Sequence, residues 1–369
     1  MTLPRFFSNT PDARTLALVL LASCLSLPAT TVARPLGAQG NDFLYQVEPH
    51  DTLEQLSRRY TLRAEHWPEL QRLNQVEDPY RLPIGKVLRI PLSLIPEQPA
   101  TATIVHVAGQ VAADGRPVRP GDILRANQSL RSDAGSTATL QLEDRSLLTL
   151  PPGTTLRLRR LKSFQGTGLT DTQVDIDRGS LESTVSPDDT GVGRFEIRTP
   201  ATVTGVRGTR LRVHVDAQGS RHEVLHGNAA IESPSQGEQR LAPDRGAAYD
   251  ARGTLLGSHP LLPAPHHPNL DPGSGRLEFE PVPGASTYAV RVALDADGTR
   301  LESSRRVNGP GVFLQARGSG PRYIFVRGID ALGIEGHDAV LAVDTLRIGL
   351  RASDGTPVLG IDGTPVALD

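Results

Sequence analysis

The sequence has a single cysteine, Cys24, and a single tryptophan, Trp67. One cysteine excludes a disulfide within the chain and a metal cage built from several thiolates. Aromatic residues make up only 4% of the chain. The sequence therefore predicts neither a disulfide-stabilised fold nor a cysteine zinc site. An oxidising compartment is still compatible with it, because such compartments permit disulfides without requiring them.

The chain also lacks a surplus of charge of either sign. It has 39 Lys and Arg residues against 41 Asp and Glu residues, a formal net charge of −2. Proteins that bind nucleic acids normally present a basic surplus to the phosphates, so we predict no nucleic-acid partner. Beyond the N-terminus, no segment approaches the roughly 18 apolar residues of a membrane-spanning helix. We expect the processed protein to be soluble or lipid-anchored.

Glycine and proline, by contrast, are plentiful, with 36 and 30 of the 369 residues. This balance favours many short strands and turns over long helices. At roughly 150 residues per domain, the length predicts two or three domains. We therefore expect a multidomain, mainly β protein.

Residues 1–38 have the pattern of a secretory signal peptide. Arg5 and Arg14 supply positive charge, and an apolar stretch begins at residues 16–22. This stretch is too short and wrongly flanked for a lasting membrane span. We expect export to the periplasm or cell envelope.

Two processing routes are open. Small residues at 31–33 or 36–38 allow ordinary cleavage, which we favour although Pro35 lies close behind the first site. Residues 21–24 resemble a bacterial lipobox, which would make Cys24 a lipidated N-terminus of an outer-membrane lipoprotein. We expect contact with a membrane only if Cys24 is lipidated.

The clearest local pattern lies in residues 43–92. A short strand at 45–47 leads through a turn into a helix, where Asp51 or Thr52 can cap the free backbone N–H groups. A second helix begins near Trp67, and a second strand covers residues 87–91. The predicted order is strand, helix, helix, strand, within about 50 residues.

At these residues the chain resembles the LysM family. The matching residues are Tyr45-Gln46-Val47, Asp51-Thr52-Leu53, Leu70, Leu73-Asn74 and the run from Ile84 to Pro91. The resemblance implies binding of peptidoglycan or another N-acetylglucosamine polymer between the loop that enters the first helix and the loop that enters the last strand. The glycan-binding residues it implies are Asp51, Thr52, Leu53, Asn74, Leu82, Pro83 and Ile84.

His50 stands where the LysM family usually has glycine. Glycine adopts a positive φ without strain, whereas histidine does so poorly. We therefore expect His50 to reduce or abolish the affinity for the glycan. The alternative to glycan binding is a LysM module that acts only as a spacer.

From about residue 103 to residue 250 the sequence changes to short alternating strands separated by turns. Residues 137–142 and 210–215 both alternate between apolar and polar side chains, and Asp114-Gly115 is a typical turn. This spacing predicts a sandwich, barrel or β-roll.

Residues 195–209, with 130–138, resemble the FecR domain, and the resemblance covers roughly residues 103–250. Gly205 and Gly208 are expected at turns or bulges. Family members in iron-uptake signalling relay a receptor state to a sigma factor and need a cytoplasmic helical segment and a membrane span. The sequence shows neither pattern, so the resemblance implies an interaction domain here, with partners among unidentified envelope proteins.

Residues 222–226 read His-Glu-Val-Leu-His and match a zinc-protease signature by letter. That signature needs a helix, which brings both histidines to one metal ion. The surrounding pattern is that of a strand, on which the two histidines would lie about 13 Å apart. We expect no metal site, no cofactor and no catalytic residue, and therefore a non-enzymatic protein.

The C-terminal part is predicted in three pieces. Residues 258–275 are proline-rich and indicate a stiff, extended linker. Residues 276–346 resemble a fibronectin type III-like sandwich, although Phe279 stands where that family often has tryptophan. Residues 347–369 form a tail with a repeated Asp-Gly-Thr-Pro-Val. Modules of this kind are usually spacers or interaction surfaces.

Two functions follow. The first is a cell-envelope protein that holds peptidoglycan through LysM and presents β modules to partner proteins. The second is a periplasmic signalling or receptor-coupling protein that acts through its FecR-like domain, with LysM only for localisation.

Overall fold

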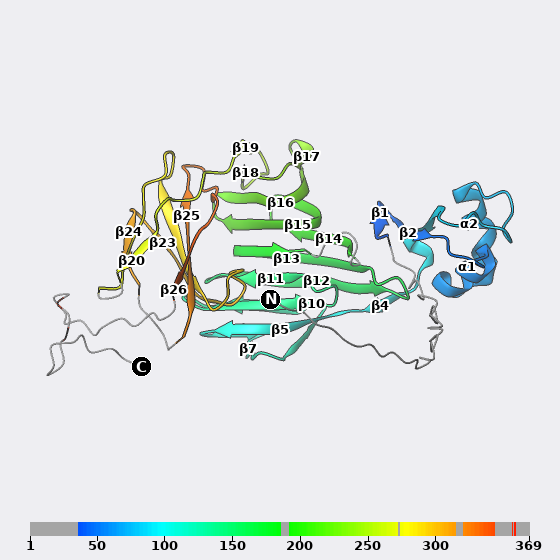
Figure 1. Cartoon of the computed structure of the whole chain (residues 1–369), viewed down its shortest axis with the longest axis horizontal. Coiled ribbons are helices and arrows are strands. Elements are labelled where there is room, and N and C mark those ends of the chain that lie inside the picture. Colours follow the sequence, from blue (N-terminus) through cyan, green and yellow to red (C-terminus); the bar gives the residue numbers. More distant parts are fainter. Residues whose placement is uncertain are drawn as a thin grey trace, which may run out of the picture. The chain divides into compact units, whose positions relative to one another are not determined.

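The computed structural model describes residues 36–185, 192–271, 274–314 and 320–343, with residues 356 and 358. Most of the predicted signal peptide, including Cys24, and most of the predicted tail lie outside the described residues. The described part is mostly β, with a small helical module ahead of a β-rich region, which confirms the predicted fold class (Figure 1).

The helical module has the predicted order of strand, helix, helix and strand. Its elements are β1 (Ala38–Gln39), β2 (Asp42–Gln46), α1 (Leu53–Thr61), a 3-10 turn (Ala64–His66), α2 (Trp67–Asn74), β3 (Val87–Pro91) and a second 3-10 turn (Leu92–Leu94). The three strands form one antiparallel sheet with β2 in the middle.

Local chemistry explains where these helices begin. The Gln55 amide donates to Thr52 Oγ1 (3.3 Å), so Thr52 caps α1 as predicted. Pro68 lies in the first turn of α2, where its missing N–H costs nothing. The aromatic rings of Phe43, Tyr45 and Tyr60 then pack together, with centroids 5.1 Å apart for Phe43–Tyr60 and 5.4 Å for Tyr45–Tyr60. This cluster joins α1 to the sheet.

The second part, which we call the β domain, is a 16-stranded sheet that folds around one apolar core. Its strands before the long ones are β4 (Glu97–Pro99), β5 (Thr101–Ala108), β6 (Val111–Ala113), β7 (Arg116–Pro117), β8 (Ile123–Arg125), β9 (Ser129–Ser132), β10 (Thr137–Leu142), β11 (Leu147–Leu150) and β12 (Thr155–Phe164). The others are β13 (Thr170–Thr184), β14 (Val192–Arg198), β15 (Val203–Asp216), β16 (Gly219–Ser233), β17 (Gly237–Leu241), β18 (Arg245–Asp250) and β19 (Leu255–Pro260).

Three long strands change partners halfway along. The first half of β13 pairs with β12 and β14, and its second half pairs with β11 and β15. Likewise β15 passes from β14 to β13, and β16 passes from β18 to β17. Leucine and valine side chains from both sets of partners share the core. The sheet is therefore continuous through these strands but doubled over its own apolar face.

Glycines with positive φ stand at the changes of partner. Gly179, Gly208 and Gly227 have φ of 99°, 56° and 77°. A Cβ on Gly227 would lie 2.7 Å from the Gly208 carbonyl oxygen, so the two strands approach too closely there for any other residue. The expected irregularity at Gly208 is confirmed by a register shift beside it, whereas Gly205 pairs regularly.

The third part consists of two sheets that share one core, and we call it the C-terminal sandwich. One sheet contains β20 (Asn269–Asp271), β21 (Arg276–Glu278) and β24 (Gly311–Phe313). The other has the order β23-β22-β25-β26, with β22 (Thr287–Ala293), β23 (Leu301–Val307), β25 (Arg322–Ile329) and β26 (Ala339–Val343). Phe279 and Tyr288, whose ring centroids lie 4.9 Å apart, belong to the shared core.

The proline-rich segment 258–275 differs from the extended spacer that its composition predicts. Residues 258–260 belong to β19 and pair with β18, while residues 269–271 form β20. Between these strands, Leu261 is buried, and its amide donates to the Asp244 carbonyl oxygen (2.9 Å). Prolines are compatible with this edge position because an edge strand leaves one side of its backbone unpaired.

The C-terminal sandwich packs against one row of directly paired residues on the β domain. The row runs through His106, Thr139, Thr149, Glu182, Arg212, Glu223, Gly246 and His259. Directly paired residues of neighbouring strands share a face, so these side chains point the same way. We call this set the cross-strand row.

Several members of the cross-strand row contact the sandwich directly. His106 Nε2 lies 2.8 Å from the Leu301 carbonyl oxygen, and His259 Nε2 lies 3.0 Å from Asp330 Oδ2. At Gly246 the absent side chain leaves room for Ile334, which lies within 2.3 Å of where a Cβ would stand. The β domain and the C-terminal sandwich therefore form an interface with specific polar and apolar contacts.

Candidate functional site

Two loops of the helical module lie side by side at the N-terminal end of α1. The Leu53 amide donates to the Pro79 carbonyl oxygen (3.0 Å), and the Gly85 amide donates to the Val47 carbonyl oxygen (2.8 Å). These bonds join the loop that enters α1 to the loop that enters β3. The two loops that the sequence proposed for glycan binding are thus adjacent.

Three of the predicted residues maintain the first loop. Asp51 Oδ2 accepts hydrogen bonds from the Tyr45 hydroxyl (2.8 Å) and the Glu48 amide (2.7 Å). Burial, reinforced by Asp51, raises the pKa of Tyr45 well above its usual range, so this hydroxyl stays protonated and donates. Thr52 caps α1, and Leu53 is fully buried. Their side chains shape the loop.

The Asn74 side chain, at the end of α2, likewise forms hydrogen bonds within the domain. Its Nδ2 donates to the Arg89 carbonyl oxygen (2.8 Å), and its Oδ1 accepts from the Arg89 amide (2.7 Å). The same Nδ2 also contacts the Leu70 carbonyl oxygen (2.9 Å). The amide of Asn74 is therefore engaged in tying α2 to β3. Leu82 is buried beneath the second loop.

The exposed apolar side chains lie on the second loop, which enters β3. Ile84 is 70% exposed, and Pro83 beside it is exposed as well. Tyr80, 69% exposed in the same loop, was missed by the sequence reasoning. The available signal was an aromatic residue with no periodic apolar neighbours, directly after Asp78-Pro79. An exposed aromatic ring and an aliphatic side chain can cover the apolar face of a sugar.

His50 has a φ of 73° and is exposed in the first loop. The backbone thus adopts the conformation for which the LysM resemblance implies glycine. Histidine holds this conformation at some cost, because its Cβ crowds the backbone in the left-handed region. His50 lies on the loop that is hydrogen-bonded to the loop carrying the exposed apolar residues.

The zinc-like run 222–226 lies on β16, as its surroundings predicted. His222 is fully buried, and its Nδ1 and Nε2 lie 3.1 Å from the hydroxyls of Thr204 and Thr202. Burial lowers the pKa of His222 to about 3, so the ring is neutral. His226 is exposed, further along the strand. Within the described residues, no group of three metal-ligating side chains comes together.

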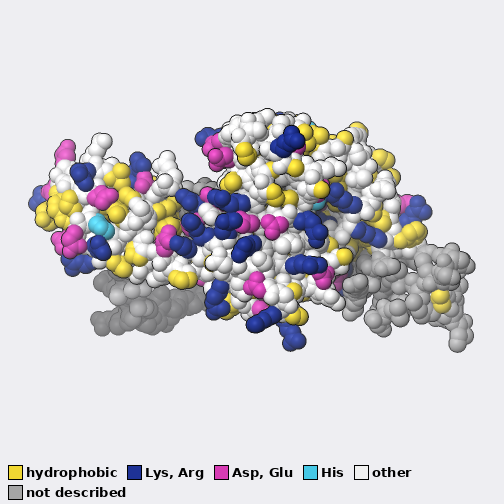
Figure 2. Space-filling model, turned by 180° about the vertical axis from the view of Figure 1, so that it is seen from behind, with side chains coloured by type: hydrophobic (Ala, Val, Ile, Leu, Met, Phe, Trp, Pro, Cys, Tyr) yellow, Lys and Arg dark blue, Asp and Glu magenta, His cyan; other side chains and the backbone are white. Residues whose placement is uncertain are grey.

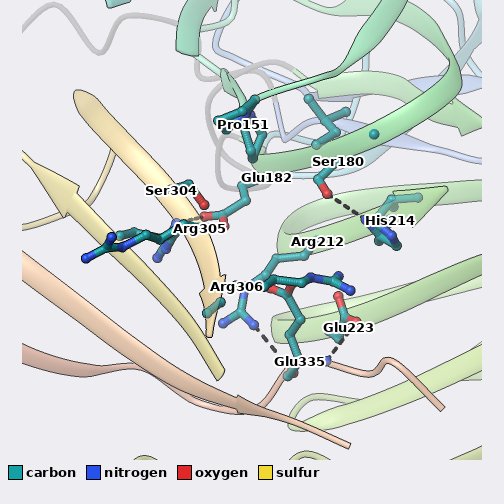
Figure 3. A pocket seen from close by; sticks show the side chains of 16 residues that line it. Pro151, Ser180, Glu182, Arg212, His214, Glu223, Ser304, Arg305, Arg306 and Glu335 are labelled. Carbon is teal, nitrogen blue, oxygen red and sulfur yellow. Dashed lines mark hydrogen bonds and ion pairs between the residues drawn. The ribbon is translucent and has the colours of Figure 1, made fainter. Parts of the chain in front are cut away.

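A buried ion cluster lies where the cross-strand row meets the C-terminal sandwich, and Figure 3 labels its members Glu182, Arg212, Glu223 and Glu335. Its members are Glu182, Arg212 and Glu223 from the β domain, and Arg291, Arg327, Glu335 and Asp338 from the sandwich. Arg327, with a fully buried side chain, contacts Glu182 (2.8 Å) and Glu335 (3.1 Å). Arg291 reaches Glu182 (2.6 Å) across the same boundary.

The carboxyl groups of the cluster have pKa values shifted in opposite directions. Burial by itself raises the pKa of Glu182, but Arg291 and Arg327 outweigh it and hold that pKa well below its usual range. Burial, and then the neighbouring carboxylate of Glu335, raises the pKa of Glu223 to about 8. Glu223 Oε1 accepts the Glu335 amide (3.1 Å). At neutral pH the cluster thus holds one protonated glutamic acid among ionised partners.

Elsewhere on the surface, charges of both signs are mixed. Figure 2 shows basic and acidic side chains interspersed on one face of the molecule, in keeping with the small net charge. Arg159 and Asp175 (2.7 Å), and Arg160 and Asp171 (2.9 Å), pair between β12 and β13. In the described part of the chain, no helix is long and apolar enough to cross a membrane.

Comparison with protein families gives two matches. The LysM domain model matches residues 45–91, and the FecR protein model matches residues 128–230. The first match covers the module from β2 to β3, and the second covers the β domain from β9 into β16. A comparison with curated proteins gave no match.

Solved structures share only limited similarity with this chain. A proposed anti-sigma factor from Parabacteroides distasonis ATCC 8503 is 18% identical over 36% of this chain and 59% of that chain, with a TM-score of 0.30. A glycoside hydrolase domain, Endo-D from Streptococcus pneumoniae R6, is 11% identical over 63% of this chain and 37% of that chain, with a TM-score of 0.16. The chain therefore spans less than two thirds of either protein.

Proposed function

Because the chain contains a LysM domain at residues 45–91 and a FecR domain at residues 128–230, we propose that it is a non-enzymatic cell-envelope protein that binds peptidoglycan or another N-acetylglucosamine polymer. LysM domains bind such glycans, and LysM and FecR are both non-catalytic families. The LysM domain binds the glycan, and the β domain and the C-terminal sandwich present surfaces to envelope proteins. The N-terminal signal pattern supports an exported location.

The observation that carries this proposal is the pair of joined loops in the LysM domain. The hydrogen bonds from Leu53 to Pro79 and from Gly85 to Val47 fix the loops against each other. Tyr80 and Ile84 stand exposed on one of them without apolar cover. Exposed apolar side chains on a small, rigid domain favour a binding surface over a spacer. The backbone of the two loops supplies polar groups for acetamido and hydroxyl groups.

The order of the C-terminal strands supports a fibronectin type III-like assignment for residues 276–346. Three strands form one sheet, and four strands in the order β23-β22-β25-β26 form the other. Such sandwiches consist of two antiparallel sheets between which the chain crosses repeatedly, as it does here from β21 to β22, from β23 to β24 and from β24 to β25. Domains of this class serve as spacers or partner-binding surfaces, and we assign that role to the C-terminal sandwich.

The FecR match favours one second function. The chain would then be a periplasmic signalling or receptor-coupling protein whose FecR domain is the active part, with LysM for localisation. Proximity labelling in living cells separates the two. Labelled receptors or sensor kinases would favour signalling, whereas labelled wall-assembly proteins would favour the wall-binding role.

Sedimentation with purified peptidoglycan sacculi tests glycan binding directly. We expect the full chain to sediment with sacculi, and Tyr80→Ala and Ile84→Asp each to reduce the bound fraction severalfold. Leu62→Asp is the matched control, because Leu62 is also an exposed apolar residue of the LysM domain (55%) but follows the far end of α1. A nine-residue helix separates it from the loops by about 13 Å.

Two results would overturn the glycan proposal. One is sedimentation that continues undiminished after removal of residues 43–91. The other is an equal loss of binding in Leu62→Asp and Ile84→Asp, which would mean that general apolar exposure drives the association. Intact mass of the exported protein tests processing separately, because a retained Cys24 with a lipid adduct would establish lipidation over ordinary cleavage.

A further inference from the structure

The strand β17 forms a free edge of the β domain. Its five residues pair with β16 on one side, and among the described residues no strand pairs with its other side (Figure 1). In the same part of the chain, no backbone hydrogen bond outside this ladder reaches residues 237–241. A strand paired on one side only presents N–H and C=O groups to which another strand can add.

Prolines limit how long an added ladder can be. Pro234 precedes β17, and Pro243 follows it. Proline has no N–H to donate, so a strand added to this edge pairs with little more than residues 237–241. Such a contact is smaller than a standard protein interface, and association through it is therefore weak.

The two charged residues of β17 are not well satisfied by the strand next to them. Glu238 and Arg240 are two residues apart, so their side chains lie on the same face. On β16, Glu238 is directly opposite Glu232, a like charge, and Arg240 is opposite Ala230. Arg240 Nε lies 3.5 Å from Glu238 Oε1, but these side chains are 87% and 59% exposed, so their pairing contributes little.

The order of these charges is complementary to itself. When two copies of β17 pair in antiparallel fashion about Gln239, Glu238 of each copy stands directly opposite Arg240 of the other. Two opposite-charge pairs form, and each stabilises the ladder. Edge charges that protect against self-association would be of one sign, because they would then repel a second copy.

Other edges in the described part of the chain lack this combination. On β23, Glu302 is bound by Arg322 (2.5 Å), and Arg305 donates to the Phe313 carbonyl oxygen. The edge strand β26 has no charged residue, and β8 has one. The complementary charges therefore single out β17.

We propose that two copies of this chain associate through β17, paired in antiparallel fashion about Gln239, so that their β domains form one continuous sheet. The contact is two-fold symmetric and uses the same edge of both copies, so it ends at a dimer. Its affinity is in the micromolar range or weaker, and at the dilution of optical unfolding experiments the chain is monomeric. The pairing does not depend on glycan binding.

Sedimentation equilibrium of the full chain over a concentration series tests the association. We expect the average mass to rise from that of one chain toward that of two. Glu238→Arg replaces two opposite-charge pairs by two like-charge pairs and should raise the dissociation constant by roughly tenfold or more. Arg240→Glu should do the same. Combining both substitutions restores the opposite-charge pairs, so the double variant should associate as the unaltered chain does.

Glu278→Arg is the matched control. Glu278 is also 59% exposed and pairs with an arginine two residues away, Arg276 (2.7 Å). Its strand, β21, has β20 on one side and β24 on the other, so it has no free edge. The same change of charge at this position should leave the dissociation constant unaltered.

A disulfide tests the register. In a Cys24→Ser background, which removes the only native cysteine, Gln239→Cys places two thiols across the two-fold axis. Directly opposed Cα atoms lie about 4.5–5.5 Å apart, within the range of a disulfide. Mild oxidation should therefore produce a covalent dimer. Gln236→Cys should produce none, because its Cα atoms would be about 20 Å apart in this register.

Several outcomes would overturn the proposal. They are a monomer throughout the concentration series, unchanged association in Glu238→Arg, no recovery in the double variant, and an equal loss in Glu278→Arg. A dimer that forms no disulfide through Gln239→Cys would also overturn it. Circular dichroism shows whether each variant is folded. If Glu238→Arg is unfolded, Arg240→Glu and the disulfide decide, because the Arg240 side chain is 87% exposed.

Discussion

Replacing Glu223 by glutamine should change how the stability of the β domain and the C-terminal sandwich depends on pH. Glu223 is 1% exposed, and burial together with Glu335 raises its pKa from 4.5 to about 8. The folded protein therefore holds a proton that the unfolded chain releases above pH 4.5. Stability falls as pH rises between these two values, by at most about 1.4 kcal/mol per pH unit.

A buried histidine opposes this trend at lower pH. His222 is held neutral with a pKa lowered from 6.5 to about 3, so the unfolded chain binds a proton there that the folded chain does not. Its contribution rises with pH up to 6.5 and is constant above it. Between pH 5 and 6.5 the His222 slope offsets the Glu223 slope, and His214, whose pKa burial also lowers, adds a further rise of stability with pH. Between pH 6.5 and 8 only the Glu223 effect remains, and it amounts to about 2 kcal/mol.

Glu223→Gln keeps the shape of the protonated acid but cannot titrate. The variant should therefore lose almost no stability between pH 6.5 and 8, where the unaltered chain loses about 2 kcal/mol. Below pH 6.5 its stability should fall toward acid, because the His222 slope is no longer balanced. Urea unfolding followed by far-ultraviolet circular dichroism measures both curves, since that signal reports the strands.

Two controls sharpen the test. Glu238→Gln changes an exposed glutamate (59%) that pairs with Arg240, and its curve should follow that of the unaltered chain. Trp67 is the only tryptophan and lies in the LysM domain, so its fluorescence follows that domain separately and should show no Glu223 slope. Parallel curves for Glu223→Gln and the unaltered chain from pH 6.5 to 8 would refute the assignment of the proton to Glu223.

Three further substitutions test other parts of the structure. Thr52→Ala removes the α1 cap and should cost about 1 kcal/mol, read from the Trp67 fluorescence transition; no change would mean that the bond to Gln55 contributes nothing. Gly227→Ala should destabilise the β domain by at least about 1–3 kcal/mol in urea, since its Cβ meets the Gly208 carbonyl oxygen at 2.7 Å; an unchanged midpoint would contradict the close approach. Arg327→Met should cost about 3–5 kcal/mol because it removes the one guanidinium that Glu182, Glu335 and Asp338 share, and a smaller cost than for an exposed arginine would refute the ion cluster.

Much of the LysM domain was predictable because its signals are local. A threonine before an apolar stripe begins α1, and a proline in the first turn begins α2. The role of Asn74 was not predictable in the same way. An asparagine at a helix end reads alike whether it faces a ligand or its own neighbouring strand, and here it bonds to Arg89, 15 residues later.

The β region was predictable as a class but not as an arrangement. Alternation identifies strands without stating their partners, and a strand that changes partners halfway looks like any other long strand. The cluster that joins the two β domains pairs Glu182 with Arg291, which are 109 residues apart. Proline density likewise indicated an extended segment at 258–275 but gave no sign that both ends join sheets. Pairings over such distances depend on the assembled fold.

The cross-strand row has a consequence for how related sequences can diverge. Among the described residues, Glu182 forms ion pairs only with arginines of the C-terminal sandwich, so loss of both Arg291 and Arg327 leaves a largely buried carboxylate without an ion pair. Substitutions on the two sides must therefore be inherited together. Relatives whose FecR domain is followed by a different partner, or by none, should replace the glutamates and arginine of this row with residues suited to water.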